Sequence, residues 1–135
     1  MKIFSKILIT LIVLISLTSC EKEQGKIPII KFKSSSGYTS ESNEIIANSS
    51  FKIGIDAYKS ETRDYLTKIT VTKSVNNGQA LEVFSKDLSK SERDTYSYDY
   101  SSEVGSTSNE TEKFTFKVIT KRGLTNELYL TLRVQ

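Results

Sequence analysis

The sequence has no histidine, no tryptophan, one cysteine and one proline among its 135 residues. Without histidine there is no imidazole base, no Ser-His-Asp triad and no imidazole metal ligand. A single cysteine excludes an internal disulfide framework and any zinc site built from several thiolates. The length suits one domain, since domains commonly hold roughly 100–200 residues. Much of enzyme chemistry is therefore excluded before any pattern is considered.

Long apolar runs are also scarce, and the only one stands at the N-terminus. Two lysines precede a mostly apolar stretch from Ile7 to Leu17. A basic start followed by about 7–15 apolar residues is typical of a secretory signal peptide. The run is too short for a transmembrane helix, which needs about 20 residues. We therefore expect residues 1–19 to be a signal peptide that takes no part in the fold.

The stretch ends in Leu17-Thr18-Ser19-Cys20, with small residues at the two positions before the only cysteine. This segment resembles the lipobox of bacterial lipoproteins. The resemblance implies diacylglyceryl transfer to the Cys20 thiol, cleavage before Cys20 and acylation of the new amine. An ordinary secretory signal that ends near a cysteine is the alternative. Each buried methylene contributes about 0.8 kcal/mol, so two or three acyl chains would hold the protein on a bilayer.

Loss of residues 1–19 removes two lysines and leaves 17 basic residues against 16 acidic ones. The remaining lysines and arginines form no cluster, and binding to nucleic acid by counterion release needs one. We therefore expect no nucleic-acid partner.

Residues 20–26 are polar, and we interpret them as a lipidated tether with a reach of about 20 Å. Residues 27–135 are then left for the domain.

From residue 27 onward, apolar and polar residues alternate. The alternation is clearest in Phe51, Ile53, Ile55 and Ala57, in Phe114, Phe116 and Val118, and in Leu128, Leu130, Leu132 and Val134. Successive side chains of a strand point to opposite faces, so this pattern predicts half-buried antiparallel strands. We expect seven strands, at 27–33, 49–58, 65–73, 79–84, 95–101, 112–120 and 127–134. Leu81 and Val83 continue the apolar series in the fourth of them.

Turn residues agree with this division. Asn76-Asn77-Gly78 and Lys121-Arg122-Gly123 stand between predicted strands, and asparagine and glycine tolerate the positive φ of tight hairpins. About seven alternating strands in roughly 100 residues predict an all-β fold, an Ig-like antiparallel β-sandwich. A small closed barrel is the alternative architecture.

Four features together resemble the small lipoproteins of Bacteroidota that carry one Ig-like or cadherin-like sandwich. They are the lipobox, the strand Lys113-Phe114-Thr115-Phe116-Lys117-Val118, the turn Lys121-Arg122-Gly123-Leu124-Thr125 and the terminal Leu-x-Leu-x-Leu-x-Val strand. The resemblance implies a lipid-anchored protein of the bacterial cell envelope, at the outer membrane, on either its surface or its periplasmic side. We expect it to be a binding or structural interaction module with a protein or glycan partner.

Catalytic and metal-binding patterns are sparse. A glycosidase needs two positioned carboxylates, but the acidic residues lie mostly in polar connectors or on solvent-facing strand positions. No Gly-x-Ser-x-Gly elbow is present. Asp87, Glu92, Asp94 and Asp99 are close in sequence but lack the Asp-x-Asp-x-Asp spacing of a calcium loop, and solvated loops explain them better. We expect no enzymatic activity, no metal and no cofactor.

The most unusual segment carries three tyrosines on one strand face: Tyr96, Tyr98 and Tyr100. In one interpretation the rings cover the core while their hydroxyls reach water, because aromatic residues suit strands and bury large areas. In the other they form an exposed ladder spaced about 6.6–7 Å along the strand. Such a ladder could anchor a protein partner or stack sugar rings. The three tyrosines are therefore the candidate ligand-binding residues, and the alternative function is a carbohydrate-binding module of a polysaccharide-capture system.

Overall fold

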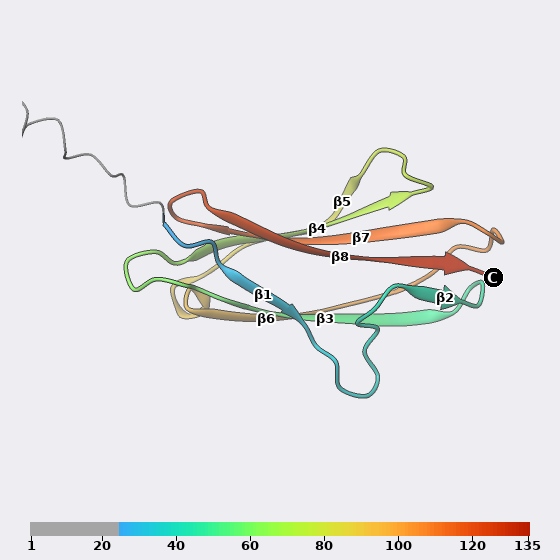
Figure 1. The fold of residues 1–135 in the computed structure, drawn as a ribbon, viewed down its shortest axis with the longest axis horizontal. Helices are drawn as coiled ribbons and strands as arrows, with labels where there is room; N and C mark the ends of the chain where they lie inside the picture. Colours follow the sequence, from blue (N-terminus) through green and yellow to red (C-terminus); the bar gives the residue numbers. More distant parts are fainter. Residues whose placement is uncertain (1–24) are drawn as a thin grey trace, which may run out of the picture.

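The computed structural model describes residues 25–135, which form two β-sheets packed face to face (Figure 1). The strands are β1 (Ile29–Phe32), β2 (Asn43–Ile45), β3 (Ser50–Tyr58), β4 (Leu66–Val75), β5 (Leu81–Asp87), β6 (Thr95–Glu103), β7 (Thr111–Thr120) and β8 (Thr125–Val134). One 3-10 turn, η1 (Lys90–Glu92), lies between β5 and β6. The expected signal peptide and Cys20 lie outside the described residues. Within residues 25–135, no helix has the length and apolarity needed to cross a membrane.

The strand order identifies the type of sandwich. One sheet, sheet A, has the order β1-β3-β6, and the other, sheet B, has the order β2-β8-β7-β4-β5. Neighbouring strands are antiparallel except β2, which runs parallel to β8. Immunoglobulin-type sandwiches place strands A, B and E in one sheet and C, F and G in the other. Here β1, β3 and β6 take the first set of positions and β4, β7 and β8 the second.

The predicted Ig-like antiparallel sandwich is therefore confirmed, with eight strands instead of seven. The closed-barrel alternative is wrong, because the strands form two separate sheets with free edges. Each predicted strand coincides with an observed one, and only β2 was missed. With three residues, β2 is too short to show an alternating pattern, and it joins sheet B through backbone pairing with β8.

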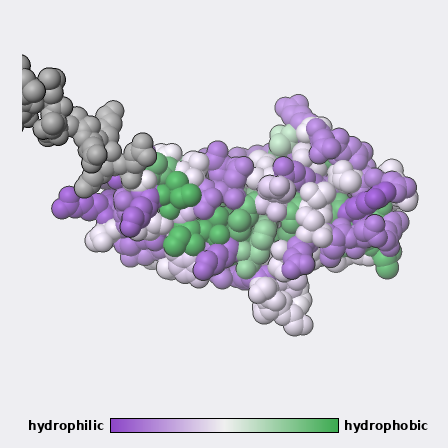
Figure 2. Space-filling model, in the orientation of Figure 1, coloured by the Kyte–Doolittle hydropathy of each residue, from purple (hydrophilic) through white to green (hydrophobic). Residues whose placement is uncertain are grey.

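The core lies between the sheets and consists of the inward-facing residues that the alternation predicts. Phe114, Phe116 and Val118 of β7 are fully buried, as are Ile53 and Ile55 of β3. Burial of each such side chain contributes roughly 1.5–3 kcal/mol. Figure 2 shows apolar residues along the seam between the sheets, on the side of β1 and β8, with hydrophilic residues to either side.

Both predicted hairpin turns are present. Asn76 and Asn77 adopt φ angles of 50° and 58° between β4 and β5, and the Gly78 N–H donates to the Val75 carbonyl at 2.8 Å. Gly123, with φ of 80°, turns the chain from β7 into β8. Left-handed backbone at these positions gives a hairpin the twist of its strands, which explains the choice of asparagine and glycine.

The predicted phase of the β5 region is wrong. Leu81 and Val83 are 64% and 41% exposed, and Phe84 instead lies opposite the core residue Val71. The register between β4 and β5 shifts at Val71/Thr72, where Val83 is the extra residue of a β-bulge. Because a slip of one residue exchanges the two faces of a strand, the bulge turns Phe84 inward in place of Val83. Leu81, which precedes the bulge, lies opposite Lys73 and is exposed although it keeps the inward phase.

Candidate functional site at the β5 and β6 edges

The three tyrosines lie on the inner face of β6, half-buried against the core. Tyr98 stacks on Phe84 of β5, with ring centroids 4.1 Å apart and an interplanar angle of 15°. Tyr96 extends the stack at 6.5 Å from Tyr98. Tyr100 packs against Phe114, with centroids 5.6 Å apart. The tyrosines therefore close the side of the sandwich on which β5 and β6 form the sheet edges.

Little ring surface is left for a ligand in this arrangement. The Lys86 ammonium group lies 4.9 Å from the Tyr96 ring centroid, and Tyr98 has Phe84 and Tyr96 as ring neighbours. Burial raises the pKa of the Tyr98 hydroxyl above its usual value, because an apolar environment disfavours the charged form. The packing favours the interpretation in which the rings cover the core. The carbohydrate-binding role of Tyr96, Tyr98 and Tyr100 stays a prediction.

Three of the four carboxylates considered as calcium ligands are engaged in ion pairs: Glu92, Asp94 and Asp99. Asp94 pairs with Lys59 at 2.6 Å, and Glu92 pairs with Lys86. The hydrogen bond from Lys86, followed by those from Ser89, lowers the pKa of Glu92 to about 2. Within residues 25–135, no three histidine, cysteine, aspartate or glutamate side chains are grouped so that they could hold a metal ion.

The sequence patterns did not predict a polar cluster on the outer face of β6, in which the Asp99 carboxylate binds two lysines and a tyrosine hydroxyl. Lys33 lies 2.6 Å from its Oδ1, and Lys52 lies 3.1 Å from its Oδ2. The Tyr38 hydroxyl donates to Oδ2 at 2.8 Å. The Lys52 ammonium group also lies 4.7 Å from the centroid of the Tyr38 ring. Asp99 thus ties the segment between β1 and β2 to the outside of sheet A.

Gly54 makes this cluster possible. A Cβ atom at Gly54 would lie 2.5 Å from Cε1 of the Tyr38 ring and 2.6 Å from Cδ of Lys33. Glycine within a strand often marks the close approach of another part of the chain. Here it lets the Tyr38 ring lie directly on β3, and the Thr39 N–H donates to the Lys52 carbonyl at 2.7 Å to complete the attachment.

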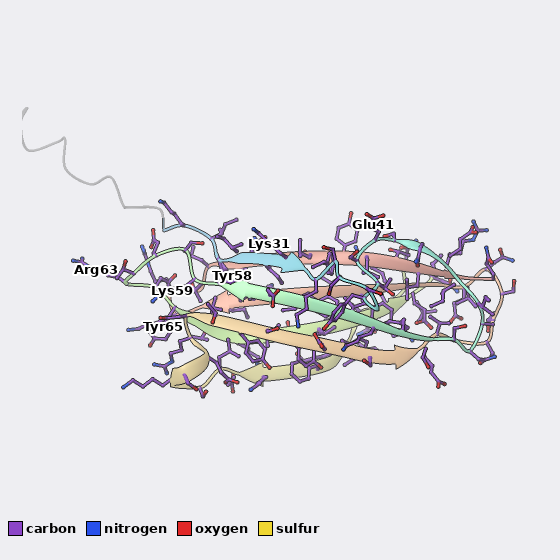
Figure 3. The ribbon with its side chains drawn as sticks, turned by 90° about the horizontal axis from the view of Figure 1, so that it is seen from below. Lys31, Glu41, Tyr58, Lys59, Arg63 and Tyr65 are labelled. Carbon is purple, nitrogen blue, oxygen red and sulfur yellow. The ribbon has the colours of Figure 1, made fainter. Side chains whose placement is uncertain are left out.

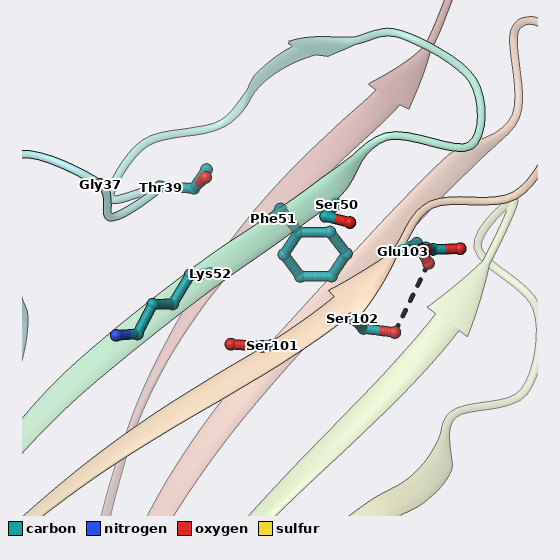
Figure 4. A pocket seen from close by; sticks show the side chains of 8 residues that line it. All are labelled: Gly37, Thr39, Ser50, Phe51, Lys52, Ser101, Ser102 and Glu103. Atoms are coloured by element: carbon teal, nitrogen blue, oxygen red, sulfur yellow. Dashed lines mark hydrogen bonds between the residues drawn. The ribbon is translucent and has the colours of Figure 1, made fainter.

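A shallow groove of about 560 Å³ runs beside this cluster (Figure 4). Its lining residues are Gly37, Thr39, Ser50, Phe51, Lys52, Ser101, Ser102 and Glu103. The hydroxyl groups could bond a polar ligand, but Lys52 is already paired with Asp99 and Phe51 is buried. The groove therefore offers neither an unengaged lysine nor an exposed ring with which to hold a ligand.

The Asp99 cluster predicts a pH dependence of stability. The hydrogen bonds from Lys33 above all, and then from Tyr38 and Lys52, lower the pKa of Asp99 to about 2, against about 3.9 in an unfolded chain. Because the folded-state pKa is the lower one, the ionised carboxylate stabilises the fold above about pH 4, and this contribution is lost as the pH falls towards 2.

We expect Asp99→Asn to reduce the free energy of unfolding by about 1 kcal/mol at pH 7. The effect is modest because the Asp99 side chain is about one third exposed, and solvent therefore weakens its ion pairs. The difference from the unchanged protein should disappear near pH 2. Urea unfolding at pH 7, 4 and 2 measures it. A difference that stayed constant over this range would show that the Asp99 charge contributes nothing.

The β4–β5 hairpin carries an exposed apolar surface. A groove of about 340 Å³ is lined there by Lys73, Val75, Gly78, Gln79, Leu81 and Val83, and its three aliphatic side chains are 38–64% exposed. We call these six residues the hairpin groove. The hairpin bends away from sheet A (Figure 1), so no strand of the described residues covers this surface. β5 is also a sheet edge, paired only with β4 in this part of the chain.

Comparisons with known proteins bear on the fold. No protein-family model and no curated protein matches the sequence. The solved structures similar to this chain include the superoxide reductase (neelaredoxin) from Ignicoccus hospitalis, with a TM-score of 0.54 and 7% identity over 82% of this chain and 81% of that one. A second structure, of a variant of the same reductase, gives a TM-score of 0.56 and 8% identity over 84% of each chain. At this identity the likeness shows the sandwich fold alone, and the reductase activity belongs to those proteins.

Proposed function

We propose that this protein is a lipid-anchored, non-catalytic interaction module of a bacterial cell envelope, which binds a protein partner through the hairpin groove. The observation that carries the proposal is the exposed apolar surface of Val75, Leu81 and Val83 beside an unpaired strand edge. Contiguous exposed apolar surface marks interaction sites in soluble domains.

The place where the described chain joins the sandwich supports an anchor at that end. Gly25 lies beside Arg122, and the Lys26 N–H donates to Glu61 of the β3–β4 loop at 3.0 Å. Figure 3 shows Lys59 and Arg63 at this same end of the sandwich. Of these two residues, Lys59 is already paired with Asp94, and an exposed arginine such as Arg63 is attracted to anionic headgroups when it lies close to a bilayer. This end would face the membrane, and the hairpin groove would point away from it.

One experiment tests both parts of the proposal. The full chain is expressed in a bacterium that processes lipoproteins, and intact cells are treated with a short amine-reactive cross-linker. We expect the protein in the membrane fraction with one discrete cross-linked adduct to a protein other than a second copy of this chain. Cys20→Ser should release it from the membrane fraction, and Leu81→Asp with Val83→Asp should abolish the adduct. Ile46→Asp, at an apolar residue that is 70% exposed elsewhere, should change neither.

The two arms fail separately. Membrane association that persists in the Cys20→Ser chain would contradict the lipid anchor. An adduct that survives both aspartates, or is lost equally with Ile46→Asp, would contradict the hairpin groove as the binding surface. Retention of the unchanged protein on polysaccharide gels, with no protein adduct, would favour the carbohydrate-binding alternative.

A further inference from the structure

The four sheet edges are protected to very different degrees. Native proteins block edge pairing with short strands, proline, lysine or bulges. β1 has four residues and follows Pro28, and β2 has three. β5 has the bulge at Val83 and carries Lys86. β6 is a continuous nine-residue edge with no bulge, proline or lysine, and its only strand partner within residues 25–135 is β3.

Two hydrogen bonds at the ends of the β3–β6 ladder show which backbone groups of β6 are free. The Lys59 N–H donates to the Asp94 carbonyl, and the Val104 N–H donates to the Ser49 carbonyl. Hydrogen-bonded pairs alternate along an antiparallel ladder, so even-numbered residues of β6 bond to β3. The N–H and C=O groups of Ser97, Asp99 and Ser101 therefore point out of the free edge.

The sequence of β6 reads almost the same in both directions about Tyr98. In an antiparallel pairing of two copies centred there, Tyr96 lies opposite Tyr100, and Tyr98 lies opposite its own symmetry mate. On the outer face, Ser97 lies opposite Asp99. A centre at Asp99 would instead set two carboxylates face to face, which is unfavourable in a strand pair.

We infer that β6 pairs with β6 of a second copy of this chain about a two-fold axis at Tyr98, joining the two A sheets into one sheet of six strands. Residues 95, 97, 99 and 101 have outward backbone groups and face one another in this register, which gives about eight hydrogen bonds. The tyrosine pairs lie in the positions where cross-strand side chains approach most closely, and aromatic pairs stabilise such ladders. The interface concerns β6 and does not depend on the partner proposed for the hairpin groove.

Ser97→Pro tests the pairing without disturbing β3. Proline is tolerated on an edge strand where the missing N–H faces outward, and the Ser97 N–H points away from β3. We expect the full mature chain in detergent to be a dimer by light scattering. Ser97→Pro should weaken dimerisation by roughly 10- to 100-fold, because two hydrogen bonds are lost across the axis. Ser97→Ala should remain a dimer, and both variants should match the thermal midpoint of the unchanged chain when all three are diluted until they are monomeric.

A cross-link identifies the register. Tyr98→Cys places two thiols across the axis at a Cα separation of about 4.5 Å, within the range of a disulfide. Tyr96→Cys, a matched change on the same face, leaves its symmetry mate about 13 Å away along the strand. Mild oxidation should give a covalent dimer for the first variant only, and none for the unchanged chain, because its one cysteine, Cys20, carries the proposed lipid on its sulfur.

Three results would overturn this inference. They are a monomeric chain at every concentration tested, a Ser97→Pro chain that dimerises as well as Ser97→Ala, and equal disulfide yields at positions 96 and 98. A monomer that still forms the membrane adduct would leave the proposed function standing. A dimer that forms no membrane adduct would leave this inference standing and contradict the proposed function.

Discussion

Replacing Lys73 by methionine is expected to lower the free energy of unfolding by about 3 kcal/mol, because it leaves a buried carboxylate without its cation. Glu112 is 1% exposed, and its Oε2 lies 2.9 Å from the Lys73 ammonium nitrogen. Its Oε1 accepts the Gly105 N–H at 2.9 Å. Methionine keeps the aliphatic stem of the lysine and removes only the charge, and urea unfolding at pH 7 measures the loss.

Two further variants separate this charge effect from packing. Glu112→Gln added to Lys73→Met should recover most of the lost stability, because the amide oxygen can still accept the Gly105 N–H and no charge is left buried. Lys68→Met removes a half-buried lysine from the same strand, at a position away from Glu112, so it should change stability by less than about 0.5 kcal/mol. A loss below about 1 kcal/mol for Lys73→Met would show that Glu112 does not depend on this cation.

The position of this ion pair could have been read from the sequence. Glu112 shares the inward phase of Phe114 and Phe116, and Lys73 shares that of Ile69 and Val71. The alternation that correctly predicts the core strands therefore also points these two charges inward. Taken alone, each resembles an ordinary surface residue at the end of a strand, and only the pairing of β4 with β7 brings them together.

The features that sequence patterns could not predict depend on contacts between distant segments. The position of Tyr38 on Gly54 joins the loop after β1 to β3, and no local periodicity records it. The β5 bulge is a single extra residue whose effect appears only against the register of β4. Strand alternation is local and strong, so every strand but the three-residue β2 could be predicted. A binding surface follows from how edges and loops meet, and the fold class does not supply it.

The second large effect is expected for Tyr98→Ala, which should reduce the free energy of unfolding by about 2–3 kcal/mol. The ring is half-buried and stacked on Phe84 at 4.1 Å, so its removal leaves a gap between the edges of the two sheets. Tyr129→Ala is the matched control, since that tyrosine is 60% exposed on β8. Apart from the lost contact between the Tyr129 ring and Lys113, this replacement should lower the free energy of unfolding by less than about 0.5 kcal/mol.

Stability and sugar retention, measured on the same Tyr98→Ala protein, decide between the two interpretations of the tyrosines. If the rings belong to the core, the variant unfolds at a lower urea concentration, and the unchanged protein shows no retention on polysaccharide gels. If they form a sugar platform, the variant keeps its stability while the unchanged protein is retained on the gel and the variant is not. The contacts of Tyr98 with Phe84 and Tyr96 favour the first outcome, because a ring held between two others has lost the open faces that a sugar would need.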